Sequence, residues 1–375
     1  MTNQSSNETA ALRQAMVGEF LNLHELVAKA RANLNQNNWD YIVGGTETET
    51  TMLRNRLALD SIALRPRVLR DVGKIDASVE FLGRRLRLPI VLCPVGTLET
   101  FDPGGGATVV QAAHEFGVAH MLSSVCEPGL EAVAQAAPAA LRMFQLYVRG
   151  DQAWVDAHVE RAMAQGYAMF CLTVDTAIYS RRERDIAKRH MTTGRIRASG
   201  NEFQAALDWR TVERIKRRFA IPLALKGIAT AEDAKIALDH GVEFIYVSNH
   251  GGRQLDHGRG AMEVLPEIVD AVAGRAAIIV DGGFCRGTDI IKAIAAGAHL
   301  VGLGRMQCYA LAAAGQPGIV RMLELLEDEV RRSLGLVGVT SFGKLDASCL
   351  QAAAPTNPPH ALSAFPLLEI EKYRY

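Results

Sequence analysis

The chain has 375 residues, and its 41 basic and 41 acidic side chains cancel without forming any block of like charge. This balance argues against a surface for nucleic acid or for an anionic membrane, and it leaves small molecules or other proteins as partners. No window approaches the apolar length needed to span a bilayer, and residues 1–10 are too polar for a signal peptide. We therefore expect a soluble cytoplasmic protein.

The six cysteines are scattered without a C-x-x-C pair, and most of them stand in apolar surroundings. This pattern favours reduced core residues over disulfides or zinc ligands, and it indicates a reducing compartment. We expect no metal site. The residues concerned are Cys93, Cys126, Cys171, Cys285, Cys308 and Cys349.

The first part of the chain is predicted to be helical after a disordered start. Residues 1 to about 17 are polar, and we assign residues 18–75 to an N-terminal helical cap because apolar residues there recur at helical spacing. The stretch Trp39 to Gly45, which includes Tyr41, ends in a glycine pair that suggests a tight turn. Residues 78–87 hold a turn signal between two extended pieces, which predicts a hairpin. The helically spaced residues are Phe20, Leu23, Val27 and Ala30.

Between residues 88 and 335, apolar strand-like runs alternate with longer helical stretches, as is typical of βα units and a parallel sheet. Eight such units predict a (β/α)8 TIM barrel, an α/β fold, rather than a doubly wound sheet. Predicted helices include 107–115, 231–239 and 288–296. The predicted strands are Pro89 to Cys93, Ala119 to Ser123, Leu141 to Tyr147, Ala168 to Val174, Pro222 to Lys226, Phe244 to Val247, Ala277 to Val280 and Leu300 to Leu303.

Polar or otherwise special residues stand where these predicted strands end. In a barrel, the carboxyl ends of the strands form the catalytic face, because the βα loops surround one mouth there. The residues are Pro94, Ser123, Tyr147, Asp175, Lys226, His250, Asp281 and Arg305.

Two segments depart from the βα rhythm. The stretch from Asp175 to Asp208 is too long for an ordinary loop after the fourth strand, so it is either a lid or binding loop or a disordered insertion. Residues 336–375 contain Ala353-Ala354-Pro355 and Pro358-Pro359, which predict an extended tail. Tails of this kind often pack on a neighbouring subunit.

Two glycine-bearing turns, after the seventh and eighth strands, predict a phosphate site. Val280-Asp281-Gly282-Gly283 precedes a helix start at Thr288-Asp289, and Leu303-Gly304-Arg305 adds backbone N–H groups and an arginine. Barrels commonly bind phosphate here, so we expect a phosphorylated ligand or cofactor. No G-x-G-x-x-G opens a first helix, which argues against a dinucleotide fingerprint.

Ionisable residues at the strand ends suggest the chemistry. The run Ser248 to Asp256 places His250 and Arg253 on one loop, where a proton acceptor and a planar cation can face one small anion. Lys226 is either a Schiff-base nucleophile or a fixed charge that stabilises a developing anion. Asp175 can pair with His250, and a purely structural ion pair is the alternative.

Further side chains are placed to hold a ligand. Gln145 and Tyr147 lie two apart on one strand and hence on one face, with Thr173 beside them, so they can bond a planar polar ligand. Arg182 and Arg253 are two cations whose simplest shared partner is a carboxylate.

The chain resembles the FMN-dependent α-hydroxy-acid oxidases and dehydrogenases, the family of glycolate oxidase, lactate oxidase, flavocytochrome b2 and mandelate dehydrogenase. The resemblance covers nearly the whole chain and centres on the run Ser248 to Asp256. The supporting motifs, in the family's order, are Asp40-Tyr41, Ser123-Ser124, Phe144 to Tyr147, Leu172 to Thr176, Arg181-Arg182-Glu183, Leu225-Lys226-Gly227, Asp281-Gly282-Gly283 and Gly304-Arg305.

The resemblance implies oxidation of an (S)-2-hydroxy acid to the 2-oxo acid, with oxygen or another acceptor reoxidising FMN, in a homotetramer. It implies that His250 takes the proton, that Asp175 stabilises the imidazolium, and that Tyr147 bonds the substrate hydroxyl. The carboxylate would be held by Tyr41, Arg182 and Arg253.

The same resemblance implies the cofactor site. Lys226 would stabilise the reduced flavin, which removes the Schiff-base alternative. The other residues implied to surround FMN are Pro94, Val95, Gly96, Ser123, Gln145, Thr173, Ser248, Asp281, Gly283, Gly304 and Arg305.

The chain departs from the family pattern in four places. Cys285 stands where an arginine is usual, so either FMN is held more weakly or Arg286 compensates. Gly96, together with Val125 in place of an aromatic residue, favours a roomy pocket and hence aromatic or larger hydroxy acids such as mandelate. The loop after Arg182 has no apolar stretch, so we expect no membrane-insertion segment.

Two other functions remain open. A different FMN barrel enzyme, such as an isomerase or reductase, has no need for the combination of His250, Arg253 and Tyr41. A non-catalytic flavin-binding barrel could have the same core.

Overall fold

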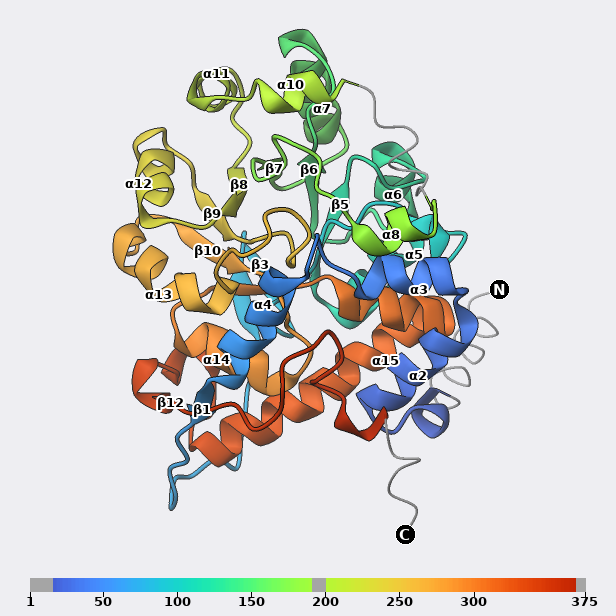
Figure 1. Ribbon diagram of the computed structural model, residues 1–375. Coiled ribbons are helices and arrows are strands. Elements are labelled where there is room, and N and C mark those ends of the chain that lie inside the picture. The colour runs from blue at the N-terminus through green and yellow to red at the C-terminus, as the bar shows by residue number, and fades with distance from the viewer. Residues whose placement is uncertain (1–15, 191–199, 369–375) are drawn as a thin grey trace, which may run out of the picture.

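The computed structural model describes residues 16–190 and 200–368, and at its centre eight parallel strands close into a barrel (Figure 1). Each strand hydrogen-bonds to the one before and after it in the chain, and the last closes on the first, as the sequence predicts. The strands are β4 (Ile90–Leu92), β5 (Ala119–Ser123), β6 (Arg142–Leu146), β7 (Phe170–Thr173), β8 (Leu223–Ile228), β9 (Phe244–Val247), β10 (Ala277–Val280) and β11 (Leu300–Leu303).

Helices surround the barrel, so the strands are buried on both faces and read as nearly continuous apolar runs. The longest, α15, contains a non-helical break at Ala314 and Gly315 and lies along α2 (Leu23–Asn33) of the N-terminal cap (Figure 1). The helices are α5 (Gly105–Phe116), α6 (Leu130–Ala136), α7 (Gln152–Ala164), α11 (Trp209–Arg218), α12 (Ala231–Asp239), α13 (Ala261–Val272), α14 (Gly287–Ala295) and α15 (Arg305–Val337).

The amino-terminal end of the barrel is closed by apolar side chains. The predicted hairpin forms from β2 (Val79–Phe81) and β3 (Arg84–Leu86). The Phe81 ring packs edge-on against the ring of Phe244, the first residue of β9, with 5.5 Å between centroids. Because these residues join the barrel interior in one apolar cluster, this end is a packed floor.

The N-terminal cap consists of α2 (Leu23–Asn33), α3 (Gln36–Val43) and α4 (Thr50–Asp60). Trp39 and Tyr41 lie on α3, and the glycine pair that predicts a turn follows this helix, with Gly44 as its C-cap. A Cβ on Gly44 would lie 2.7 Å from the Asp40 carbonyl oxygen, which explains a glycine there. Apart from residues 16 and 17, which are helical, the predicted disordered start lies outside the described residues.

A buried ion pair fixes the cap to the barrel. The Arg56 guanidinium on α4 donates to both carboxylate oxygens of Asp289 on α14, at 2.8 and 2.9 Å. Both side chains are more than nine-tenths buried. The cap is therefore part of the same body as the barrel.

The long connection after β7 contains two short helices, α8 (Glu183–Ala187) and α10 (Asn201–Ala205), with its middle, residues 191–199, outside the described part. Both ends are anchored. The Arg184 guanidinium on α8 donates to both carboxylate oxygens of Glu49 at 2.6 and 2.7 Å. The Gln204 amide on α10 donates to the Thr173 carbonyl at 2.8 Å. The described ends thus support a structured loop over the barrel mouth.

The segment after α15 folds back on its own chain. Residues of β12 (Leu350–Ala352) pair antiparallel with β1 (Ile62–Leu64), next to the cap. Farther along, the Phe365 side chain is 1% exposed. The expected extended tail is therefore partly a strand, and its packing on a neighbouring subunit stays a prediction.

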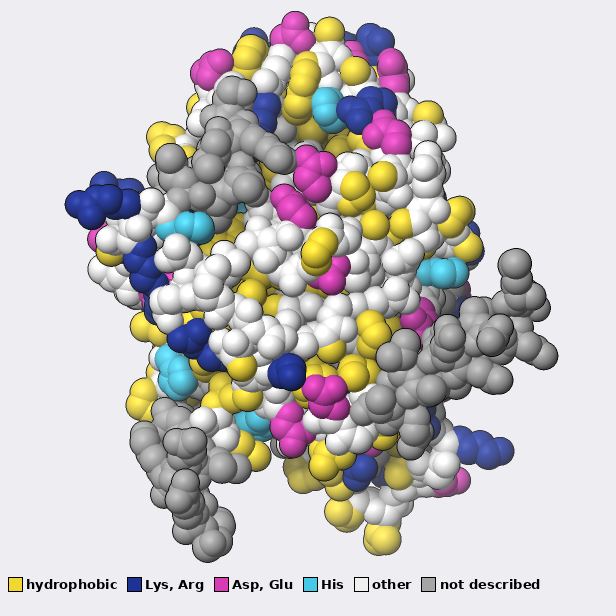
Figure 2. Space-filling model, turned by 90° about the vertical axis from the view of Figure 1, so that its right-hand side faces the viewer, with side chains coloured by type: hydrophobic (Ala, Val, Ile, Leu, Met, Phe, Trp, Pro, Cys, Tyr) yellow, Lys and Arg dark blue, Asp and Glu magenta, His cyan; other side chains and the backbone are white. Residues whose placement is uncertain are grey.

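Other surface and composition features can be checked directly. No helix among the described residues combines the length and the hydropathy needed to cross a bilayer. All six cysteines are free, and Cys349 alone among them is only partly buried. Basic and acidic side chains are interspersed on the face shown in Figure 2.

Candidate active site

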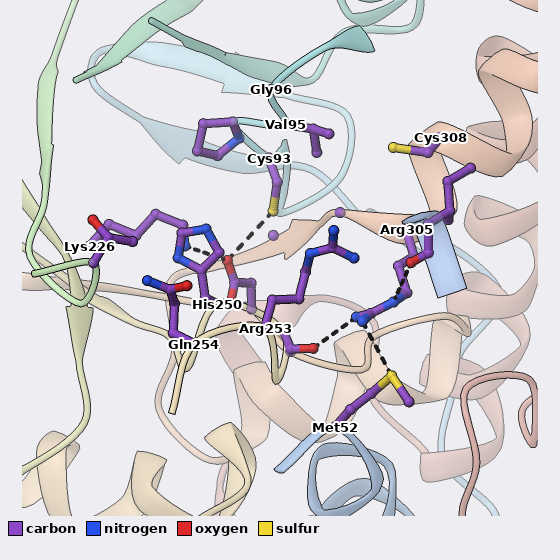
Figure 3. A pocket seen from close by; sticks show the side chains of 18 of the residues that line it. Met52, Cys93, Val95, Gly96, Lys226, His250, Arg253, Gln254, Arg305 and Cys308 are labelled. Carbon is purple, nitrogen blue, oxygen red and sulfur yellow. Dashed lines mark hydrogen bonds and ion pairs between the residues drawn. The ribbon is translucent and has the colours of Figure 1, made fainter. Parts of the chain in front are cut away.

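A cleft opens at the carboxyl ends of the barrel strands and runs between the barrel mouth and the cap (Figure 3). Not all predicted site residues line this cleft. Four of them are fully buried beneath its surface: Ser123, Gln145, Thr173 and Ser248. Asp175 is partly buried behind His250. The predicted site residues that line the cleft are Tyr41, Pro94, Val95, Gly96, Tyr147, Arg182, Lys226, His250, Arg253, Asp281, Gly283, Gly304 and Arg305.

His250 is the middle residue of three hydrogen-bonded side chains in the cleft wall. Its Nδ1 lies 3.1 and 3.2 Å from the two carboxylate oxygens of Asp175, which follows β7. Its Nε2 lies 3.0 Å from the Tyr147 hydroxyl, which follows β6. The His250 backbone has a φ of 60°, and this left-handed conformation turns the chain immediately after Asn249. The sequence-predicted pairing of Asp175 with His250 is present.

The electrostatics leave the His250 imidazole neutral. Burial lowers its pKa below the ordinary value, and the charges of Lys226 and Arg182 lower it further, while Asp175 opposes the shift. Asp175 has its own pKa held below the usual range, because neighbouring positive charge and hydrogen bonds outweigh its burial. A neutral imidazole whose Nδ1–H faces a carboxylate presents Nε2 to the cleft as a proton acceptor.

Lys226 is held as a fixed cation at the end of β8. Its ammonium group donates to the Ser248 hydroxyl at 2.9 Å and lies 3.5 Å from an Asp281 carboxylate oxygen. Ser248 in turn donates to the other Asp281 oxygen at 2.6 Å. Although burial alone would lower the Lys226 pKa, Asp281 and Asp175 raise it above its ordinary value. A permanently charged amine is a poor nucleophile, so the geometry favours the fixed-charge role.

Two arginines bring positive charge to the cleft without an acidic partner among the described residues. The Arg253 guanidinium donates to the backbone carbonyls of Tyr41 and Gly44 at 2.6 and 3.0 Å, and it lies 4.7 Å from the Tyr41 ring centroid. Burial and the neighbouring Arg182 lower its pKa to about 10. The Arg182 guanidinium lies 5.8 Å from the same ring, and its buried Nε has no hydrogen-bond partner. This arrangement is suited to a small anion.

The opposite end of the cleft is formed by backbone. Helix α15 starts at Arg305 with no side-chain cap on its N-terminus, and Gly304 precedes it. A Cβ on Gly304 would meet no atom within 4 Å, so this position faces open space. A free helix N-terminus attracts a phosphate.

The helix after β10, α14, does not present a free N-terminus to the cleft. Asp289 accepts hydrogen bonds from the backbone N–H groups of Cys285 and Arg286, both at 3.0 Å. Glu329 on α15 accepts the N–H of Gly287 at 2.7 Å. The N-terminus of α14 is therefore already satisfied by carboxylates of the chain itself.

Arg286 also does not compensate for Cys285 in the way the sequence suggests. Its guanidinium pairs with Glu329 and donates to the Ala364 carbonyl at 3.2 Å, and Arg286 does not line the cleft, whereas Cys285 does. Arg305 does line the cleft, but its guanidinium donates to the carbonyls of Ile42, Gly251 and Gly44 at 2.9 to 3.0 Å.

One buried polar atom fits the edge of a planar cofactor. The Gln145 amide nitrogen donates to the Thr173 hydroxyl at 2.8 Å, whereas its buried oxygen has no partner. An orphaned buried acceptor is costly unless a ligand supplies a donor, and an isoalloxazine ring carries an N–H group. The residues present therefore fit FMN: an unpaired acceptor and a fixed cation for the ring, and a free helix N-terminus for the phosphate.

Gly96 does not open space in the way we expected. A Cβ at this position would lie 2.7 Å from a Val125 methyl group, so Val125 occupies the volume that a larger residue would need. Any extra room on the substrate side must come from the small size of Val125 itself.

Sequence reasoning missed the polar contribution of α4. Asn55 and Asn249 exchange hydrogen bonds between their side chains at 2.7 and 2.9 Å, and Asn55 lines the cleft. The side-chain amide of Asn55 also lies against Gly282, and the Asn55 backbone lies against Gly283. One signal in the sequence was available: α4 carries several polar residues, more than a helix that only packs through an apolar face requires.

Comparison with known proteins identifies the family. The profile of the FMN-dependent dehydrogenases matches residues 30–200 and 187–352. An L-lactate oxidase of Nostoc is 36% identical, with 88% of this chain and 98% of that protein aligned. Glycolate oxidase 1 of Zea mays is also 36% identical, over 88% of this chain and 95% of the relative.

Solved structures agree with these relatives. The crystal structure of a mandelate oxidase with benzoyl-formic acid superposes with a TM-score of 0.83 at 37% identity, covering 90% of this chain and all of the other. A mutant of mandelate oxidase with (S)-mandelic acid gives the same TM-score.

Proposed function

This protein belongs to the family of FMN-dependent dehydrogenases, so it binds FMN and oxidises a 2-hydroxy acid, and we propose that the hydrogen-bonded side chains of Asp175, His250 and Tyr147 perform the proton transfer. The proposal rests on this hydrogen-bonded row of three side chains, in which the neutral His250 imidazole lies near the buried Lys226 cation. A flavin isomerase or a mere flavin-binding barrel has no use for it.

The substrate carboxylate is held by Arg253 and Arg182, with the Tyr41 hydroxyl beside them. The guanidinium carbons of Arg253 and Arg182 lie 4.7 and 5.8 Å from the centroid of the Tyr41 ring. Because both cations are next to this one ring, a carboxylate can reach them together. This contact fixes the hydroxyl-bearing carbon of the substrate relative to His250, which reduces the entropy cost of reaching the reactive geometry.

His250 Nε2 takes the proton, and Asp175 stabilises the imidazolium that results. Tyr147 stays protonated, because burial raises its pKa above the ordinary value, and its hydroxyl donates to the substrate oxygen. When bound, FMN supplies the two-electron acceptor, with the 2-oxo acid as product.

Pro94 to Gly96 would lie against the FMN ring, with the free Gln145 oxygen accepting a hydrogen bond from a ring N–H and the Lys226 ammonium donating one. The N-terminus of α15, near Gly283 and Gly304, would hold the phosphate. The charged Lys226 would stabilise the negative charge of the reduced ring. Oxygen is the electron acceptor that the names of the relatives support, and hydrogen peroxide is then the second product.

The substrate is an (S)-2-hydroxy acid with an apolar side chain larger than that of glycolate. Val125, Phe101 and Val148 line the cleft, and none of the three presents a polar side-chain atom. The likeness to mandelate oxidase supports an aromatic side chain.

Anaerobic mixing of the flavin-loaded protein with glycolate, lactate, mandelate, 4-hydroxymandelate and long-chain hydroxy acids tests this function. We expect the flavin absorbance to bleach fastest with mandelate and to return rapidly when oxygen is admitted. No bleaching with any member of the panel contradicts the function, and slow return contradicts oxygen as acceptor.

Val125→Phe tests the substrate class on the same panel. The larger side chain fills the proposed substrate space, so kcat/KM for mandelate should fall about tenfold or more while that for glycolate changes little. Ile178→Phe, at an exposed position outside the cleft lining, is the control. An equal loss for both acids would contradict the assignment of Val125 to the substrate pocket. Size-exclusion chromatography of the wild type tests the proposed homotetramer.

A further inference from the structure

The phosphate end of the cleft lacks an uncommitted cation among the described residues that line it. Arg56 is bound to Asp289 and Asp60. Most donors of Arg305 are taken by backbone carbonyls. A bound phosphate would therefore rely on backbone N–H groups unless another side chain reaches it.

The segment from Ala353 to Leu368 supplies such a side chain. It follows β12, lies beyond the last residue matched by the family profile, residue 352, and still belongs to the described fold. Two of its residues, His360 and Ala361, line the same cleft as Phe284 and Cys285. A part of the chain outside the family match thus completes the cofactor cleft.

Contacts on both sides hold this segment in place. Before it, β12 pairs with β1. Within it, after His360, the Ala364 carbonyl accepts a hydrogen bond from Arg286, and the buried Phe365 ring packs edge-on against His24 with 5.7 Å between centroids. The turn between them is closed by the Ser363 hydroxyl, which donates to the His360 carbonyl at 2.9 Å. His360 is therefore presented on an ordered turn.

The His360 ring is oriented as a hydrogen-bond donor. Its Nδ1 accepts the backbone N–H of Leu362 at 3.2 Å. A neutral imidazole that accepts at Nδ1 carries its proton on Nε2, so Nε2–H is the free donor. Such a donor forms its strongest hydrogen bond with a charged acceptor such as a phosphate oxygen, because hydrogen bonds to charged groups are stronger than those between neutral groups.

We propose that residues 353–368 form an intrachain clasp over the phosphate end of the cofactor cleft, and that His360 donates a hydrogen bond to the FMN phosphate. The clasp takes the place of the side-chain contact that Cys285 cannot make. This inference rests on the phosphate position proposed above, at the N-terminus of α15.

Titration of the flavin-free, full-length chain with FMN and with riboflavin tests the clasp, because riboflavin has the same ring and no phosphate. His360→Ala should weaken FMN binding about tenfold, the loss of one hydrogen bond to a charged group, and leave riboflavin binding unchanged. His360→Gln keeps an N–H donor and should restore part of the affinity. His114→Ala, an exposed histidine on α5, is the matched control and should change neither.

Gly304→Ala separates failure of the clasp from failure of the phosphate position. The new methyl group meets no protein atom within 4 Å but projects into the space assigned to the phosphate. It should weaken FMN and spare riboflavin. If Gly304→Ala does so and His360→Ala does not, the clasp is wrong; if neither variant affects FMN, the phosphate lies elsewhere. Equal loss of FMN and riboflavin in His360→Ala would also overturn the clasp, since it would indicate a merely structural role.

Discussion

At the amino-terminal end of the barrel, Phe81 and Phe244 pack within an entirely apolar cluster, whereas at the carboxyl-terminal end Lys226, Asp281 and Asp175 meet within hydrogen-bonding distance of their neighbours. Both ends are formed by the same strands. Apolar burial at the floor contributes directly to the free energy of folding, while the charges at the mouth carry a desolvation cost that their mutual pairing offsets.

The contrast teaches that stability and chemistry are separated along the strand direction. Inward-facing positions early in each strand fill the core, and those at strand ends project into the cleft. Substitutions at the floor should therefore alter stability and spare catalysis, and substitutions at the mouth should do the reverse.

His250→Ala should give the largest effect. Because it removes the proposed proton acceptor, kcat should fall by about 10²- to 10⁴-fold, while the flavin and the unfolding temperature are retained. Stopped-flow bleaching of the flavin measures the loss. His257→Ala, on the same loop and with one weak contact to Thr48, is the control. A large fall in unfolding temperature in His250→Ala would break the proposed separation.

Phe81→Ala should show the opposite behaviour. Deleting this buried ring, which is 6% exposed, should lower the free energy of unfolding by about 3–5 kcal/mol. Denaturant unfolding with excess FMN measures the change, and Glu80→Ala, its exposed neighbour on β2, is the control. If kcat for the folded variant falls along with its stability, the two ends are coupled and the contrast fails.

Asp175→Asn should give a smaller effect that sharpens the account of the mouth. His250 must be neutral to accept a proton, so activity is present above its lowered pKa and is lost as the pH falls through it. Asp175 raises that pKa, and its removal should therefore move the acid limb of the kcat/KM profile to lower pH while lowering the plateau about tenfold or more.

The pH profile of the wild type and of Asp233→Asn, an exposed aspartate on α12, provides the reference. An acid limb that moves to higher pH in Asp175→Asn would show that the carboxylate does not act through the imidazole.

Strand positions could be predicted because their signal is local. Each barrel strand lies within two residues of its expected ends, since a run such as Phe244 to Val247 is apolar on both faces and bounded by polar residues. The pairing of Asp175 with His250 follows from the same count, because parallel strands bring their ends to one mouth. Helix α3 lies within the predicted helical cap, and the glycine pair that follows it marks its end.

Contacts between distant segments could not be predicted in this way. Whether Arg286 turns toward the cleft or toward Glu329 depends on where α15 passes, which no local pattern encodes. The effect of Gly96 likewise depends on Val125, which belongs to the neighbouring loop and lies directly against it. The path of the tail to His360 is of the same kind, since its proline-rich composition predicts extension and gives no destination.

The sealed floor also constrains the order of events during turnover. Because the hairpin of β2 and β3 closes the amino-terminal end, the hydroxy acid, its 2-oxo product and oxygen, the proposed electron acceptor, would share the entrance at the cap side. Product departure and oxygen arrival then compete for one passage. We expect added 2-oxo acid to slow the oxidative half-reaction in stopped-flow measurements, with kinetics set by exit rather than by bond cleavage.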